Sequence, residues 1–448
     1  MEYDVIIIGF GKGGKTLAST LANQGKKIAV VEKSNKMYGG TCINVGCIPS
    51  KSLVNNSLLA KRLPTKHQNS FYQSAIDEKR WVVEMLRQKN FDKLNNHPNI
   101  TIYDGIGSFE DEHTIKVTNN QDVKMITGET IYINTGAKSF IPNIVGIEDN
   151  EFIYYSDSLM DKEELPQELI IIGGGYISME FASMYTNFGS HVSILQNEDI
   201  FLPREDNDIS ENIEYILKNK GVDIYESVDI VNINKDTILF YQKGKECRIK
   251  GDTILVATGR RPNVEELEVK NAGIELTKRG AIKVDDNLKT SVDNIYALGD
   301  VHGGLQFTYT SLDDYRIIMN NLNGNNYNLT NRINVPYSVF MDPPLSRVGL
   351  SETQAKQQGL NYQVVTMATS VIPKAQVSNR TEGMLKAIID NNTGKILGAA
   401  LLCEDSYEMI NIIKLAMDFN ASYKTLANQI FTHPTMSEAL NDLFSLVK

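Results

Sequence analysis

The sequence predicts an α/β protein that contains one βαβ unit twice and ends in a third, α+β domain. First, 448 residues with 42% apolar side chains are too many for one ordinary domain and suit two to four. Second, an apolar run, a glycine-rich turn and an apolar-periodic helix follow one another near residue 5 and again near residue 169. Third, strand-like and then helix-like runs follow Pro336, an order typical of an α+β domain.

The first unit continues from its glycine turn through a helix to a strand that ends on Glu32. In a G-x-G-x-x-G turn, Gly9 permits the tight bend, Gly11 lets a pyrophosphate approach the backbone, and Gly14 lets the helix pack closely. The free N–H groups at the helix start attract the pyrophosphate, and Glu32 stands at the position of a ribose ligand. An ordinary glycine turn lacks this context, so the unit predicts a bound dinucleotide.

The second unit has its turn at Gly173 and Gly175 and a strand that ends before Gln196. The first glycine and the strand-end residue are 23 positions apart in both units, 9 to 32 and 173 to 196. Ser178 replaces the third glycine and is small enough for close packing. Gln196 binds a ribose diol less strongly than a carboxylate and does not repel a 2′-phosphate, which leaves NADH and NADPH open. The alternative is a relic unit that binds no nucleotide.

Cys42 and Cys47 are five positions apart in the stretch GGTCINVGCIPSK. One strained helical turn would bring their sulfurs to disulfide distance, with Leu53–Leu59 continuing that helix. A helix N-terminus lowers the pKa of a thiol and favours the nucleophilic thiolate. A zinc site would need further ligands, whereas Cys247 and Cys403 are isolated and are interpreted as packing residues. A pair of inert buried thiols is the other alternative.

Three further turns, at residues 135–137, 258–263 and 297–300, follow strands and carry small residues. Small residues let the backbone lie against a cofactor, and Asp300 can bind a polyol hydroxyl. Each turn is weak support alone, since any α/β fold contains such turns. Beside two dinucleotide-type turns, they favour a cofactor-binding protein.

Near the C-terminus, His433 begins the stretch HPTMSE, which ends on Glu438. Histidine is the side chain best suited to move a proton near neutral pH, and a thiol that must cycle through its thiolate needs such a partner. Glu438 can orient the imidazole, but Thr435-x-x-Glu438 also matches a helix capping box. Both interpretations stay open.

The formal net charge of −10 argues against nucleic acid, which requires a basic surface. No run reaches the roughly 18 apolar residues that span a bilayer, so no membrane partner is expected. The chain enters a strand at Val5, which leaves no room for a signal peptide. We therefore expect a cytoplasmic protein.

Together these motifs resemble the flavoprotein pyridine-nucleotide–disulfide oxidoreductases, which include glutathione, lipoamide and mercuric reductases, over essentially all 448 residues. The most specific elements are the cysteine motif at 39–51 and H-P-T-x-x-E at 433–438. Within this family, the runs at 303–316, 335–349 and 441–448 are most similar to the bacterial hypothiocyanous acid reductases and reactive-chlorine-resistance proteins.

The resemblance implies two Rossmann-like domains and a dimerisation domain. These are a FAD-binding domain at 1–145, an NAD(P)-binding domain at 146–261, a central segment at 262–335 that completes the FAD domain, and an interface domain at 336–448. An obligate homodimer is also implied, with His433 acting across a twofold axis on the cysteines of the other subunit. No metal site is expected.

Roles for individual residues follow from the same resemblance. Cys47 is the thiol nearest the flavin, Cys42 is the outer interchange thiol, and Tyr176 is a gate over the flavin. Lys51 lies by the flavin N5 and pairs with Glu180. The residues implied to contact FAD are Gly9, Gly11, Gly14, Glu32, Thr41, Lys51, Gly107, Asp300 and Thr308, and those implied to hold the nicotinamide nucleotide are Gly173, Gly175, Tyr176, Gly259 and Arg260.

The implied reaction carries electrons from NADH or NADPH through FAD to the Cys42–Cys47 disulfide. Cys42 then attacks a small oxidant, hypothiocyanous acid by resemblance, in defence against oxidative stress. A C-terminal cysteine pair and a metal-binding N-terminal extension are both missing, which disfavours mercury detoxification and protein disulfide reduction. The alternatives are reduction of Cu(II), Hg(II) or a low-molecular-weight disulfide, and a redox sensor read by a partner protein.

Overall fold

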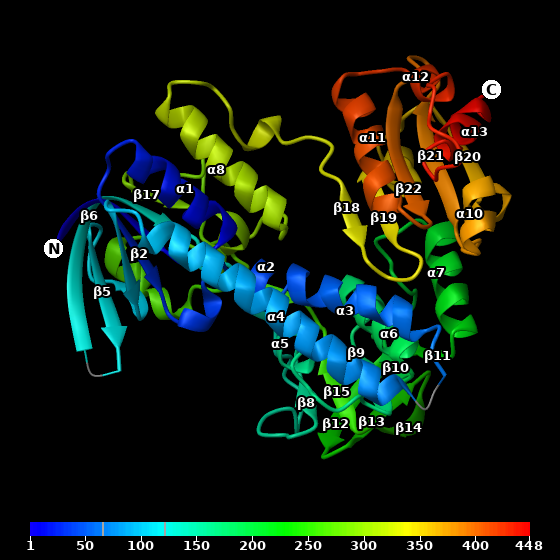
Figure 1. The fold of residues 1–448 in the computed structure, drawn as a ribbon, viewed down its shortest axis with the longest axis horizontal. Coiled ribbons are helices and arrows are strands. Elements are labelled where there is room, and N and C mark those ends of the chain that lie inside the picture. The colour runs from blue at the N-terminus through cyan, green and yellow to red at the C-terminus, as the bar shows by residue number, and fades with distance from the viewer. Residues whose placement is uncertain (65–66, 121) are drawn as a thin grey trace.

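The computed structural model describes residues 1–64, 67–120 and 122–448. Residues 65, 66 and 121, which fall inside the predicted FAD-binding domain, lie outside the described part. Three lobes, each with its own sheet, are visible in Figure 1, with the N-terminus at the left and the C-terminus at the upper right. Within the described ranges, no helix is long and apolar enough to cross a membrane.

The first lobe is built on a seven-stranded sheet of order β3-β2-β1-β6-β5-β4, with β17 also paired to β6. The strands β1, β2 and β3 pair in parallel, and β6 pairs in parallel with β1 and with β17. The strand β2 is buried along its whole length, as its continuous apolar run requires. The strands are β1 (Glu2–Ile8), β2 (Ile28–Glu32), β3 (Ile100–Asp104), β4 (Ile106–Phe109), β5 (Thr114–Asn119), β6 (Asp122–Ile133) and β17 (Ile295–Ala297).

Two helices, α1 (Lys12–Asn23) and α8 (Thr308–Leu322), contact each other over this sheet (Figure 1). The cysteines lie on α2 (Thr41–Asn44) and α3 (Cys47–Ala60). The 28-residue helix α4 (Gln68–Asn95) packs along α3 and runs from the first lobe to the second (Figure 1).

The second lobe repeats the parallel arrangement in a sheet of order β11-β10-β9-β15-β8. An antiparallel meander, β12-β13-β14, and the pair β16-β7 complete it. The elements are β7 (Ala137–Ser139), β8 (Ile153–Tyr154), α5 (Ser156–Leu159), β9 (Glu168–Ile172), α6 (Tyr176–Phe188), β10 (His191–Leu195), α7 (Asn207–Asn219), β11 (Val222–Tyr225), β12 (Val228–Asn234), β13 (Thr237–Gln242), β14 (Lys245–Lys250), β15 (Thr253–Val256) and β16 (Arg260–Pro262).

The third lobe is a five-stranded antiparallel sheet of order β18-β19-β22-β21-β20, with helices packed against it. Its strands β21 and β22 are buried along most of their length, and one face of the sheet packs against α11 and α13. The elements are β18 (Tyr337–Val339), β19 (Leu345–Gly349), α9 (Glu352–Gln357), β20 (Tyr362–Ala368), α10 (Pro373–Ser378), β21 (Met384–Asp390), β22 (Ile396–Leu402), α11 (Ser406–Asp418), α12 (Tyr423–Ala427) and α13 (Ala439–Ser445).

The α/β fold class with two Rossmann-like units and a third, α+β lobe is confirmed. The expected single helical turn across the cysteines is wrong, because α2 ends at Asn44 and α3 begins at Cys47. A β-carbon at Gly46 would lie 3.0 Å from the Thr41 carbonyl oxygen, so the break allows a close approach of the two helices. The sequence also missed the β12–β14 meander, and β1 begins at Glu2 rather than Val5. The domain boundaries at 145, 261 and 335 stay predictions.

Candidate active site

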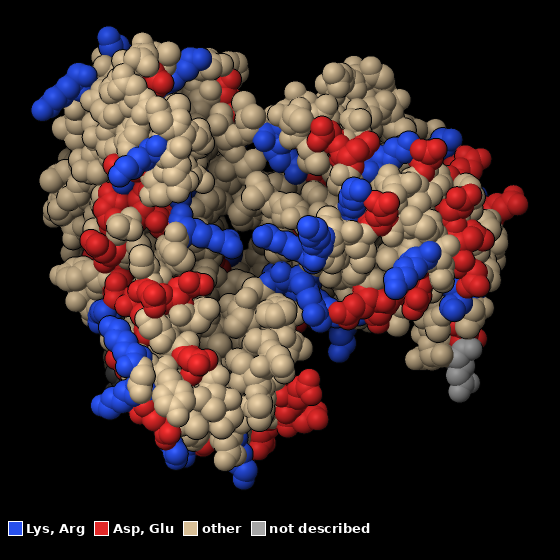
Figure 2. Space-filling model, turned by 180° about the vertical axis from the view of Figure 1, so that it is seen from behind, with Lys and Arg blue, Asp and Glu red and all other residues tan. Residues whose placement is uncertain are grey.

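A cavity of about 1890 Å³ lies between the lobes and contains most of the predicted site residues. Figure 2 shows a hollow near the centre of one face, with Lys and Arg side chains around it. The predicted residues that line the cavity are Gly9, Gly11, Glu32, Thr41, Cys42, Cys47, Lys51, Gly107, Tyr176, Glu180, Arg260, Asp300 and Thr308. The predicted residues outside this lining are Gly14, Gly173, Gly175, Gly259, His433 and Glu438.

The first glycine turn is held by Asn134, which follows β6. The Asn134 Oδ1 accepts from the Gly14 N–H at 2.9 Å, and its Nδ2 donates to the Leu298 carbonyl at 2.7 Å. At the start of α1, the Gly13 and Gly14 N–H groups donate to Ser311 Oγ and Asn134 Oδ1, whereas Gly11 and Lys12 line the cavity and Gly11 has no side-chain cap. The backbone at Gly11 and Lys12 is therefore the part of the turn that can face a diphosphate.

Glu32 is buried at the end of β2, where its carboxylate accepts from the Phe10 N–H at 3.0 Å and from the Ser34 N–H at 3.3 Å. Burial raises the pKa of Glu32 to about 6, against the lowering effect of these hydrogen bonds. A carboxylate held in this way at the cavity wall suits a ribose diol, as the spacing from Gly9 predicts.

A buried cluster of charged side chains, made of Asp314, His302 and Arg332, binds the turn that carries Asp300. Asp314 accepts from the Gly299 N–H at 2.6 Å and from His302 Nε2 at 3.3 Å, and it pairs with Arg332. Burial alone would raise the pKa of Asp314, but His302 and Arg332 hold it below the ordinary value. The pKa of Asp300 itself is raised by burial.

The second turn follows β9 and is less crowded. Gly175 caps α6 without a side-chain hydrogen bond, and a β-carbon there would meet no atom within 4 Å. Gln196 is buried against the turn, since a β-carbon on Gly174 would lie 1.9 Å from its Oε1. Gly173 and Gly175 therefore leave a helix N-terminus open to a diphosphate, with an amide at the ribose position.

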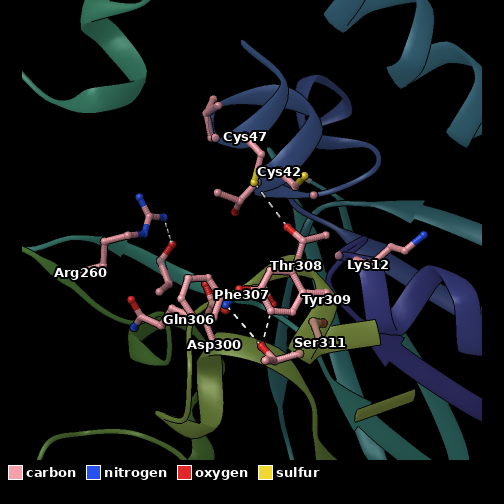
Figure 3. A pocket seen from close by; sticks show the side chains of 18 of the residues that line it. Lys12, Cys42, Cys47, Arg260, Asp300, Gln306, Phe307, Thr308, Tyr309 and Ser311 are labelled. Atoms are coloured by element: carbon pink, nitrogen blue, oxygen red, sulfur yellow. Dashed lines mark hydrogen bonds between the residues drawn. The ribbon is translucent and has the colours of Figure 1, made fainter. Parts of the chain in front are cut away.

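The two cysteines lie on neighbouring helices at the top of the cavity, with Thr308 opposite (Figure 3). Cys47 is the first residue of α3, and its Sγ lies 3.5 Å from Thr308 Oγ1. Cys47 is exposed to the cavity, whereas Cys42 is half-buried. Both cysteines are free thiols in the structure.

The two thiols differ sharply in acidity. The hydrogen bond from Cys42 lowers the pKa of Cys47 to about 6, and Thr308 and the Lys51 charge add to this against the effect of burial. The same hydrogen bond, followed by burial, raises the pKa of Cys42 well above its ordinary value. In the reduced pair, Cys47 is therefore the thiolate at neutral pH, and Cys42 keeps its proton until a base removes it.

Lys51 lies on α3, one helical turn after Cys47, and pairs with Glu180 of α6. Its Nζ lies 2.8 Å and 2.9 Å from the two Glu180 carboxylate oxygens and 4.7 Å from the centre of the Phe340 ring. Glu180 Oε1 also accepts from the Phe340 N–H at 2.9 Å. The ammonium is thus fixed in the cavity wall beside the thiolate.

His433 and Glu438 lie in the third lobe, before α13. The Nδ1 of His433 lies 2.8 Å from Glu438 Oε2, while its ring is 71% exposed. The Glu438 N–H donates to Thr435 Oγ1 at 3.3 Å, which is the backbone half of the predicted capping box. The Glu438 carboxylate contacts the His433 imidazole instead of completing the box. This pair does not reach the cavity of its own subunit.

Sequence reasoning missed two groups of residues around the cavity. Asn134 contacts the first turn, although Asn after a strand gives no local sign of this role. Glu205, which follows β10, binds Tyr176 of the cavity wall together with Tyr337 and Arg347. These contacts join residues far apart in the chain, so no spacing pattern reveals them.

The remaining cysteines lie away from the cavity. Cys403 is fully buried in the core of the third lobe, where burial raises its pKa, and Cys247 is half-buried on β14. Within the described ranges, no group of three or more His, Cys, Asp or Glu side chains could hold a metal ion.

The first residues of α1 and α6, the buried Glu32 carboxyl group and a reactive cysteine pair all line one cavity, which indicates a disulfide oxidoreductase with two dinucleotide sites. The cavity exceeds the ~300–1,000 Å³ typical of a site for one drug-sized ligand, which fits a large cofactor together with a second nucleotide.

Comparison with known proteins gives the same class. The model of the pyridine nucleotide-disulphide oxidoreductase family matches residues 3–314, and that of the family's dimerisation domain matches residues 335–444. The chain is 51% identical over 448 residues to a probable pyridine nucleotide-disulfide oxidoreductase, RclA, of Escherichia coli K12, with 100% of both chains covered. It is 32% identical to a mercuric reductase of Staphylococcus aureus, covering 98% of this chain and 81% of that protein.

Solved structures agree. The structure of the HOCl-induced flavoprotein disulfide reductase RclA from E. coli, described as a Cu(II) complex, superposes with a TM-score of 0.95 at 49% identity over 100% of both chains. The chain therefore belongs to the pyridine nucleotide-disulphide oxidoreductase family. It is an FAD-dependent NAD(P)H oxidoreductase that carries the dimerisation domain of that family.

Proposed function

We propose that this enzyme uses NADH or NADPH to reduce a small electrophilic oxidant, hypothiocyanous acid, and so protects against reactive halogen stress. The observation that carries the proposal is the unequal thiol pair, Cys42 and Cys47, in a cavity lined by the first dinucleotide turn and by Tyr176, which directly follows the second. The likeness to an HOCl-induced disulfide reductase supports the stress role.

The cofactor contacts in this proposal follow the family resemblance. Bound FAD supplies two-electron transfer between the nicotinamide and the disulfide. Glu180 holds the Lys51 ammonium beside the reacting groups, where the Lys51 charge favours the Cys47 thiolate and the Glu180 charge opposes it. The residues proposed to hold FAD are Gly9, Gly11, Gly14, Glu32, Thr41, Lys51, Gly107, Asp300 and Thr308, and those proposed to hold the nicotinamide nucleotide are Gly173, Gly175, Tyr176, Gly259 and Arg260.

In the proposed oxidant step, the Cys42 thiolate attacks the sulfur of hypothiocyanous acid. A Cys42 S–S bond to thiocyanate forms, and hydroxide leaves as water after taking a proton. The Cys47 thiolate then attacks the Cys42 sulfur, so that the disulfide forms and thiocyanate leaves with the electron pair. The dithiol is oxidised by two electrons, and the oxidant is reduced to thiocyanate and water.

Cys42 needs a base, because its raised pKa keeps it protonated. His433 is held by Glu438 but does not line the cavity of its own subunit. We propose that His433 of the partner subunit takes the Cys42 proton and returns it to the leaving hydroxide. A homodimer would then be required for turnover.

Steady-state oxidation of NADH and NADPH against an acceptor panel tests the substrate. We expect hypothiocyanous acid to give a higher kcat/KM than Cu(II), Hg(II) or glutathione disulfide. Cys42→Ser should lower that activity by roughly a thousandfold, whereas the matched variant Cys247→Ser keeps it. Full activity in Cys42→Ser would contradict the proposal.

Mixed dimers test the action of His433 across the subunits. A dimer of one His433→Ala subunit and one Cys42→Ser subunit contains one complete site only if His433 acts in trans. We expect about half of the wild-type activity from such dimers, while each homodimer is inactive. Inactive mixed dimers would show that His433 acts within its own subunit, and an active His433→Ala homodimer would show that His433 is not needed.

A second candidate activity is reduction of Cu(II) or Hg(II) by the same thiols. It is favoured by the Cu(II) complex described for the E. coli structure and by the 32% identity to mercuric reductases. A higher kcat/KM for either ion in the panel would make it the leading activity. Slow nucleotide oxidation with every acceptor would instead favour a redox sensor.

A further inference from the structure

A buried carboxylate holds Tyr176 in the wall of the cavity. The hydroxyl of Tyr176 donates to Glu205 Oε1 at 2.7 Å, and the hydroxyl of Tyr337 donates to the same oxygen at 2.7 Å. The two hydroxyls lie 3.1 Å apart, and the ring centres are separated by 5.5 Å. Glu205 thus accepts hydrogen bonds from two tyrosines that belong to different lobes.

Arg347 balances the charge of this carboxylate. Its Nη1 lies 3.0 Å from Glu205 Oε2, and the exposed fractions of the two side chains are 8% and 0%. Arg347 on β19 stands opposite Tyr337 on β18, and its guanidinium lies 5.9 Å from the centre of the Tyr337 ring. With both oxygens satisfied, Glu205 is an anchored acceptor, and its hydrogen bonds to hydroxyls are of the strong, charge-assisted kind.

Tyr176 lies between the second glycine turn and the cavity, so its hydrogen bond to Glu205 affects access from one to the other. It is the first residue of α6, directly after Gly175, and it lines the cavity that also contains Cys47 and Lys51. A dinucleotide whose diphosphate lies at the Gly173–Gly175 turn must extend its nicotinamide past this ring to reach the cavity. Burial and the Glu205 charge raise the pKa of Tyr176 to about 12, so its hydroxyl remains a donor at every physiological pH.

We propose that Glu205, braced by Arg347, is a positioning residue that latches Tyr176 across the nicotinamide path when no nucleotide is bound. The inference rests on the proposed assignment of the second turn to NAD(P)H. Nucleotide binding must break the hydrogen bond from Tyr176 to Glu205. The apparent dissociation constant for the nucleotide therefore equals the intrinsic constant divided by the fraction of molecules in which this bond is already broken. The hydrogen bond from Tyr337 keeps the acceptor satisfied while Tyr176 moves.

Anaerobic stopped-flow reduction of the bound flavin by NADH and NADPH tests the latch without any oxidant. Glu205→Gln keeps the shape but weakens the acceptor, and Tyr176→Phe keeps the ring but removes the donor. We expect each to lower the apparent nucleotide dissociation constant by roughly threefold to tenfold, and we expect Glu205→Gln, whose side chain does not line the cavity, to leave the limiting rate unchanged. The double variant should do no more than either single variant, because both remove one interaction.

Tyr185→Phe is the matched control. It removes a buried hydroxyl from the same helix, one that lies 3.3 Å from the Tyr72 hydroxyl and away from the cavity. Unchanged dissociation constants in both single variants, or additive effects in the double variant, would overturn the latch. If Glu205→Gln fails to fold, Tyr176→Phe against Tyr185→Phe decides alone. Absence of flavin reduction in the wild type would instead reject the proposed nucleotide site.

Discussion

The two glycine turns share one spacing but have different surroundings. In the first turn, a β-carbon on Gly11 would lie 2.4 Å from Asn134 Oδ1, and Glu32 is buried and hydrogen-bonded to the backbone. In the second turn, a β-carbon on Gly175 would meet no atom within 4 Å, and Gln196 takes the place of the carboxylate. The second turn also ends at Tyr176, which is tied to a side chain of another loop.

This difference matches two kinds of ligand. The first turn is in close contact with Asn134, as suits a cofactor that stays bound through many turnovers. The second turn has free space at Gly175 and is followed directly by Tyr176, as suits the nucleotide that we propose to bind and leave there in each cycle. The same βαβ unit is therefore adapted to retention or exchange by the residues around it, not by the glycines.

The largest expected difference between the turns is in FAD affinity, when a glycine of one turn or the other is replaced by alanine. Gly11→Ala forces Asn134 out of its place, so we expect the FAD affinity to fall by roughly tenfold to a hundredfold. Gly175→Ala meets no protein atom, so its FAD content should equal that of the wild type while nucleotide binding weakens. Flavin absorbance per subunit after dialysis measures both. Equal loss of FAD in the two variants would remove the distinction between the turns.

A smaller effect is expected from restoring a carboxylate to the second unit. Gln196→Glu places a negative charge at the ribose position, where it attracts a diol and repels a 2′-phosphate. We expect the ratio of kcat/KM for NADH to that for NADPH to rise about tenfold. Gln167→Glu adds the same charge at an exposed site and should leave the ratio unchanged. An unchanged ratio in Gln196→Glu would mean that the ribose lies elsewhere.

The smallest effect concerns the third position of the turn. Ser178 stands where the first unit has Gly14, and its buried Oγ has no hydrogen-bond partner among the described residues. Ser178→Ala should therefore leave thermal stability unchanged or raise it by up to about 1 kcal/mol. Ser183→Ala, on the same helix, removes the acceptor of the Asp342 N–H and should cost about 1 kcal/mol or more. Thermal unfolding of both variants checks the contrast.

Local patterns predicted the parts of the site that lie within one βαβ unit. The spacing from Gly9 to Glu32 and the C-x4-C motif are short-range signals, so the turns and the cysteines could be identified from the sequence. The break at Gly46 could not, since it depends on how closely two helices approach. Asn134 and Glu205 acquire their roles from contacts across the fold, for which the chain carries no local sign.

The assignment of Cys47 to the flavin side and Cys42 to the substrate side is the central claim. A thiolate beside an oxidised flavin gives a long-wavelength charge-transfer absorbance after two-electron reduction. Because the pKa of Cys47 is lowered to about 6, its thiolate is present above that pH and is lost as the pH falls through it.

The direct measurement is a pH titration of this absorbance in partly reduced enzyme. We expect a midpoint near pH 6 in the wild type, a band that persists in Cys42→Ser, and no band at any pH in Cys47→Ser. A band that persists in Cys47→Ser and vanishes in Cys42→Ser would place Cys42 beside the flavin and contradict the assignment of the two cysteines.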